Sequence, residues 1–112
     1  MLSYFRIQDK SMEPYCHEGD FAVVLRMSHL KEGSVVVLKS AEGRLLLKRI
    51  TRKGGSGYWV EGDNKVESRD SRVFGWVSPK DILGRAWIVK RFGRGKKELS
   101  TSNQVAGYGT IV

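Results

Sequence analysis

Short apolar segments separated by glycine-containing turns are the feature that most limits how this chain can fold. The segments have the length of strands and are rich in Val, Leu, Ile and aromatic residues, which favours strands over helices. Many short strands at this spacing predict an all-β fold, either a small barrel or a pair of packed sheets with at most short helical turns. The five predicted strands are Phe21–Met27, Ser34–Lys39, Arg44–Arg52, Tyr58–Glu61 and Gly84–Phe92.

Three shorter segments carry signals of their own. Lys53–Gly57 contains three glycines and is expected to be a hairpin connection. Val73–Val77 is expected to be extended. Ser78–Asp81 is expected to form one helical turn, because Ser78 can cap it and a proline fits its first position.

The chain has room for one small domain. With 112 residues it is too short for two, and no repeat or internal boundary interrupts it. After residue 93 the sequence becomes polar and rich in Gly and Ser. We therefore expect a folded core over residues 1–93 and a basic, polar, flexible tail over residues 94–112.

Half of the net charge of +8 lies in one short run, residues 90–98. Such a run can attract nucleic-acid phosphates or an anionic membrane surface, which would give peripheral membrane association. A solvated basic tail is the simpler interpretation. The cations concerned are Lys90, Arg91, Arg94, Lys96 and Lys97.

Several functional classes lack their sequence signals. The single cysteine cannot form an internal disulfide, and it does not form a zinc-ligand spacing with the two histidines. The apolar runs are far shorter than the ~20 residues of a transmembrane helix, and the charged N-terminus is unlike a signal peptide. We expect a cytoplasmic protein with no integral membrane anchor, no metal and no cofactor.

One ordered set of residues is more specific than these signals. It starts with Ser11-Met12-Glu13-Pro14, continues with Lys48 in the third predicted strand, and ends with Gly62-Asp63-Asn64 and Ser68-Arg69-Asp70-Ser71-Arg72. Each piece alone occurs by chance. The complete order and spacing closely resemble the type I signal peptidases, a family of Ser/Lys serine proteases, and the resemblance covers most of the chain. It implies a β-rich catalytic core.

The resemblance also implies a role for each matching residue. Ser11 corresponds to the nucleophile, Lys48 to the general base, and Ser68 to a hydroxyl that orients the lysine amine. Asp70 and Arg72 correspond to a buried ion pair behind the site. The remaining supporting positions are Met12, Pro14, Gly62, Asp63, Asn64 and Ser71.

The residues themselves agree with a lysine base at position 48. A lysine can take a proton only when it is neutral, and at the ordinary pKa roughly one in 2,500 is neutral at pH 7. Burial among apolar groups is the usual way to lower that pKa. In a strand, Lys48 shares one face with Leu46 and Ile50, while Arg49 points the other way. The competing interpretation is a surface lysine on an edge strand.

Two residues beside the nucleophile depart from the resemblance. Asp9 stands where the family often has a Ser or Gly that helps to bind the oxyanion, and an ionised carboxylate there would repel it. Either Asp9 turns away or the second oxyanion donor differs. Lys10 stands where Gly is common, and its charge could offset that of Asp9.

Only ten residues precede Ser11, so the usual membrane anchor is not expected and a short soluble branch is indicated. The chain then resembles the nickel-type superoxide dismutase maturation proteases, which remove an N-terminal extension from a protein substrate. LexA-type self-cleaving peptidases are one alternative. They fit less well because no cleavable segment precedes Ser11, although the Ala106-Gly107 pair in the tail is of the kind such enzymes cut. A basic β-barrel that binds nucleic acid without chemistry is the other alternative.

Overall fold

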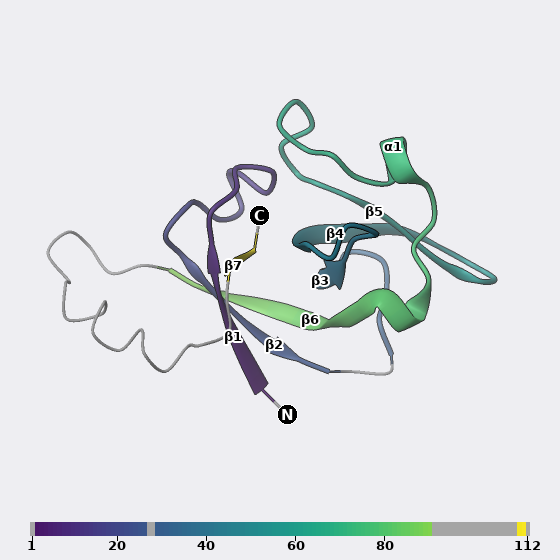
Figure 1. The fold of residues 1–112 in the computed structure, drawn as a ribbon, viewed down its shortest axis with the longest axis horizontal. Coiled ribbons are helices and arrows are strands. Elements are labelled where there is room, and N and C mark those ends of the chain that lie inside the picture. The colour runs from purple at the N-terminus through teal and green to yellow at the C-terminus, as the bar shows by residue number, and fades with distance from the viewer. Residues whose placement is uncertain (1, 27–28, 91–109, 112) are drawn as a thin grey trace, which may run out of the picture.

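The computed structural model describes residues 2–26, 29–90 and 110–111 (Figure 1). Short strands dominate it, as the glycine-punctuated apolar segments predict. In chain order the elements are β1 (Leu2–Ile7), β2 (Phe21–Leu25), β3 (Val35–Lys39), β4 (Leu45–Gly54), β5 (Gly57–Glu61), α1 (Ser71–Phe74), η1 (Pro79–Asp81), β6 (Ile82–Val89) and β7 (Thr110–Ile111).

The seven strands of the described residues form one sheet, in the order β5-β4-β3-β6-β2-β1-β7. Neighbouring strands are antiparallel, except that β1 and β7 run parallel. β7 lies at one end of this order, yet it also contacts β4 near the other end. The sheet therefore curls back on itself, with β3, β4 and β5 grouped apart from β1, β2 and β7 and with β6 running between the groups (Figure 1). The prediction of an all-β fold is confirmed.

β3 lies between two hydrophobic clusters, because it is buried on both faces. Val35 and Val37 join one cluster, which also holds residues of β1, β2 and β7. Val36 and Leu38 alternate with them and join the other cluster, which holds residues of β4, β5 and β6. A continuous apolar run in β3 is therefore what this position requires.

The five strands predicted from sequence are present, and their described ends shift by only a few residues. β4 and β5 extend into the expected hairpin connection and shorten it to Gly55-Ser56. The predicted turn after Ser78 is also present as η1, and the Ser78 hydroxyl accepts a hydrogen bond from the Lys80 N–H.

The prediction that Val73–Val77 is extended is wrong over its first half, because α1 covers Ser71–Phe74. The Asp70 carboxylate caps this helix by accepting the Arg72 N–H, and Gly75 ends it with a φ of 83°. β1 and β7 were not among the predicted strands. β7 falls within residues 94–112, and its Ile111 is fully buried against the core.

Most of the basic run lies outside the described residues, namely Arg91, Arg94, Lys96 and Lys97. The Ala106-Gly107 pair also lies outside them. Lys90 is described, and its amine donates to the Tyr15 carbonyl at 2.7 Å and lies 3.6 Å from the Asp20 carboxylate. Within the described part of the chain, no helix is long and apolar enough to cross a membrane.

Candidate active site

The turn that follows β1 carries Ser11. Its first backbone hydrogen bond runs from the Glu13 N–H to the Lys10 carbonyl at 3.1 Å. Met12 anchors the turn in the first hydrophobic cluster and is 2% exposed, whereas Pro14 lies exposed on the outer side. Ser11 is also 2% exposed. A side chain fixed in the core therefore determines where the backbone presents Ser11.

Asn64 and Gly62 hold the same turn from the other side. The Asn64 main-chain N–H donates to the Ser11 carbonyl at 2.8 Å, and its side-chain amide donates to the Lys10 carbonyl at 3.0 Å. A Cβ at Gly62 would lie 2.6 Å from the Ser11 carbonyl oxygen and would also collide with the Ser68 hydroxyl. Only a residue without a side chain fits between Ser11 and Ser68.

Lys48 lies in the middle of β4 and is 1% exposed, which excludes the surface lysine of the competing interpretation. Leu46 and Ile50 flank it on the same face, as the strand alternation predicts. Burial lowers the pKa of the Lys48 amine, and the carboxylates of Asp9 and Asp70 oppose that effect. The amine donates to the Ser68 hydroxyl at 3.0 Å.

Ser68 links Lys48 to a buried carboxylate. Its hydroxyl donates to Asp70 Oδ2 at 2.6 Å, and Asp70 Oδ2 also accepts the Gly62 N–H at 2.8 Å. Burial alone would raise the pKa of Asp70, but hydrogen bonds from Arg72, Ser68 and the Gly62 amide together hold it well below its usual range. Asp70 is therefore ionised at neutral pH, and Ser68 is fixed as a donor toward it and an acceptor toward Lys48.

The ion pair behind the site is only half buried, which corrects the expectation of a buried pair. Arg72 Nε and Nη2 contact the two carboxylate oxygens of Asp70 at 2.9 and 3.1 Å. Asp70 is inaccessible, but the Arg72 side chain is 39% exposed. Ser71, the first residue of α1, is buried and its hydroxyl accepts the Val60 N–H at 2.8 Å, which ties the helix to β5.

A cavity of about 680 Å³ lies beside this network. Lys48 lines it together with Asp9, so Asp9 does not turn away from the site. The Asp9 carboxylate accepts the Lys10 N–H at 2.7 Å and raises the pKa of Lys48 through its charge. The carboxylate is therefore an electrostatic neighbour of the lysine amine.

The structure thus brings Ser11, Lys48 and Ser68 to one place. Gly62 packs against the Ser11 backbone and the Ser68 hydroxyl at once, and Ser68 receives the Lys48 amine. Among the described residues the Lys48 amine donates to the Ser68 hydroxyl, and no hydrogen bond joins it to the Ser11 hydroxyl. The arrangement places a buried amine beside the turn that carries Ser11.

A comparison with protein-family models matches residues 2–86 to the family described as Peptidase S24-like. The chain belongs to the Peptidase S24-like family. Membership indicates a serine-peptidase type of function and agrees with the broad resemblance to Ser/Lys proteases. A search of curated proteins found none that matches the chain.

This S24-like chain is thereby placed in the superfamily that contains both LexA-type and signal-peptidase-type enzymes. The sequence motifs alone favoured the signal-peptidase type over the LexA type. The family match does not distinguish between the two types. Self-cleavage therefore remains a candidate for this chain, beside cleavage of a separate substrate.

Arg49 also supports the S24-like site, and no sequence motif predicted this role. Its guanidinium contacts both carboxylate oxygens of Asp63 at 2.9 and 2.8 Å, donates to the Gly33 carbonyl at 2.9 Å, and lies over the Tyr15 ring. Met12 Sδ accepts the Asp63 N–H at 3.4 Å. Asp63 thus connects β4 with the turn that holds Ser11. The only sequence signal for this role was the alternation of β4, which places Arg49 on the opposite face from Lys48.

Proposed function

We propose that this chain is a serine endopeptidase in which Ser11 is the nucleophile and Lys48 the general base. The observation that carries the proposal is the buried Lys48 amine, held by Ser68 beside the Ser11 turn. A serine hydroxyl needs a neighbour that takes its proton, and a desolvated lysine can do so near neutral pH. Ser68, fixed by Asp70, orients the amine.

The reaction proceeds in two halves. Lys48 Nζ takes the Ser11 proton while Ser11 Oγ bonds to the carbonyl carbon of the scissile peptide. The C–N bond then breaks, and the leaving amine takes that proton from Lys48. Lys48 next removes a proton from water, whose oxygen attacks the ester, and the proton returns to Ser11 as the ester breaks. The Ser11 N–H is one donor to the oxyanion in both halves.

The substrate in this proposal is a separate protein from which an N-terminal extension is removed. Small side chains beside the scissile bond are expected from the resemblance to signal peptidases. The lysine mechanism does not depend on this choice of substrate, so the two parts are tested separately.

The first test is an NMR titration of the Lys48 amine, with Lys48→Met to assign the signal. A pKa well below the ordinary lysine value of about 10.4 supports the base role. An ordinary pKa would contradict it. Loss of peptide cleavage in Ser11→Ala, with an unchanged NMR spectrum elsewhere, is the matching result for the nucleophile.

Self-cleavage is the second candidate, and the position of β7 favours it. β7 pairs with the last residues of β1, and the Gln8 N–H donates to the Ile111 carbonyl at 3.0 Å, three residues before Ser11. The C-terminal end of the chain thus lies near the nucleophile turn. Incubation followed by mass measurement tests this candidate. Loss of a C-terminal fragment in wild type but not in Ser11→Ala would support it.

A further inference from the structure

A second cavity adjoins the one that contains Lys48. Its volume is about 240 Å³. Leu38 and Val77 form an apolar part of its lining and are 1% and 7% exposed. Four residues line both cavities, so the two spaces form one trough with Lys48 toward one end. The shared residues are Ser40, Glu42, Arg69 and Phe74.

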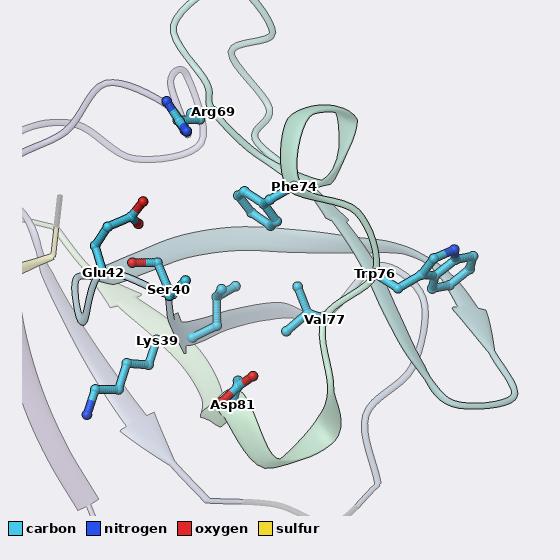
Figure 2. A pocket seen from close by; sticks show the side chains of 10 residues that line it. Lys39, Ser40, Glu42, Arg69, Phe74, Trp76, Val77 and Asp81 are labelled. Carbon is cyan, nitrogen blue, oxygen red and sulfur yellow. The ribbon is translucent and has the colours of Figure 1, made fainter.

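The trough has two opposing walls. Ser40 and Glu42 come from the turn between β3 and β4, and Phe74 leans from α1 on the other side (Figure 2). Phe74 is 39% exposed, although it lines the cavity together with the buried Leu38 and Val77. Trp76 also lines the cavity, but its ring turns away, edge to face with Trp59 at a centroid distance of 5.3 Å. Phe74 is thus the aromatic group available to an occupant.

The lining matches an extended peptide better than a small ion. Apolar side chains form the deep part, and charged groups of both signs stand at the rim, with Lys39 and Arg69 among the cations and Glu42 and Asp81 among the anions. A peptide can place an apolar side chain in the deep part and can hydrogen-bond to the rim through its main-chain donors and acceptors. No net charge at the rim selects an anion or a cation.

We infer that this trough is a specificity subsite that takes a large apolar side chain of the peptide substrate, away from the bond cut at Ser11. Phe74 is its specificity-determining residue. The inference rests on the proposed function, because the trough leads to Lys48. α1 begins after Asp70, so one short helix joins the specificity wall to the Asp70–Ser68 support of the lysine.

The test is a positional-scanning library of quenched fluorogenic peptides given to the full-length chain. Wild type is expected to prefer large apolar residues at one position. Phe74→Ala should raise KM for the preferred peptides about 10-fold with kcat nearly unchanged, because a uniform binding contact is lost. Val73→Ala is the matched control, since Val73 lies on the same helix, is 62% exposed and lines neither cavity.

A substitution on the opposite wall controls for the possibility that Phe74→Ala distorts α1. Ser40→Phe should fill the trough and shift the preference toward small side chains, whereas Ser56→Phe in the β4–β5 turn should not. An unchanged cleavage profile in both Phe74→Ala and Ser40→Phe would overturn the inference.

Binding to Ser11→Ala separates the inference from the proposed function. The same peptides should shift the backbone NMR signals of Ser40 and Phe74, and apolar peptides should do so most strongly. Absence of such shifts would overturn the subsite. Absence of Ser11-dependent cleavage, with these shifts present, would overturn the peptidase proposal and leave a peptide-binding trough.

Discussion

At the scale of single residues, burial of the Lys48 amine next to Ser68 lowers the stability of the fold. Its lowered pKa means that the unfolded chain binds the proton more tightly than the folded chain. The resulting penalty is absent above the ordinary lysine pKa of about 10.4 and grows as the pH falls from there to the folded-state value. At neutral pH the buried amine therefore lowers the free energy of unfolding.

Lys48→Met should remove both the penalty and the activity. Methionine has a similar length and no charge to desolvate, so the melting temperature at pH 7 should rise, and the gain should shrink as the pH approaches 10.4. Peptide cleavage should fall to background because the proposed base is removed. Calorimetry over a pH series measures the first effect. A lower melting temperature at pH 7 would contradict the desolvation argument.

In the proposed mechanism, Asp9 should set the pH at which the peptidase becomes active. Its charge raises the pKa of Lys48, so Asp9→Asn should lower that pKa and move the acid limb of the rate profile to lower pH. The asparagine oxygen can still accept the Lys10 N–H. Glu67→Gln is the matched control, because Glu67 lines the same cavity. An acid limb that stays in place, or moves up, would show that Asp9 does not act on Lys48.

Much of the site could be predicted at this scale, because it depends on the alternation of side chains within one strand. The alternation of β4 alone places Lys48 between Leu46 and Ile50, so its apolar surroundings follow from the sequence. The contact between Arg49 and Asp63 could not be predicted, because it depends on how the Gly62-Asp63-Asn64 turn folds back onto β4. The exposure of Arg72 depends on the same tertiary path.

At the scale of elements, the turn at Gly62 joins the Ser11 turn to the support behind Lys48. Gly62→Ala should disturb both, because the new methyl group meets the Ser11 carbonyl and the Ser68 hydroxyl. The expected cost is about 1–3 kcal/mol of stability and roughly 100-fold in kcat/KM. Denaturant unfolding and peptide cleavage measure the two effects.

Gly55→Ala provides the matched control for this substitution. Gly55 lies in the β4–β5 turn, and a Cβ there would meet nothing within 4 Å. Activity should therefore stay at the wild-type level. Equal losses in the two variants would mean that the Gly62 contacts are not what matters.

Predictions of single elements succeeded where the signal was local. Apolar runs bounded by glycine located β2 to β6, and Ser78 located the turn of η1. α1 was missed because its cap is Asp70, a residue whose carboxylate is held by the distant Gly62 amide as well as by Arg72. β7 has only two residues, and its burial comes from β1 and β4, which are both distant from it in sequence.

At the scale of the whole molecule, β7 completes the curl of the sheet. Ile111 is fully buried in the cluster that also holds Ile7 and Leu47, so Ile111→Ala should lower the free energy of unfolding by about 2–5 kcal/mol. Leu2→Ala is the control, because Leu2 is 55% exposed and should cost less than about 0.5 kcal/mol. Similar, small effects in both would show that β7 is dispensable.

The sheet order has a consequence for when the chain can cut anything. Ser11 follows β1 and Lys48 lies on β4, and three other strands stand between β1 and β4 in the sheet. The sheet between them includes the pairings of β6 with β2 and with β3, which are distant in sequence, and such pairings form slowly. In the proposed peptidase, a half-made or locally melted copy would therefore be harmless to its neighbours, since loosening a strand between β1 and β4 would move Ser11 away from Lys48.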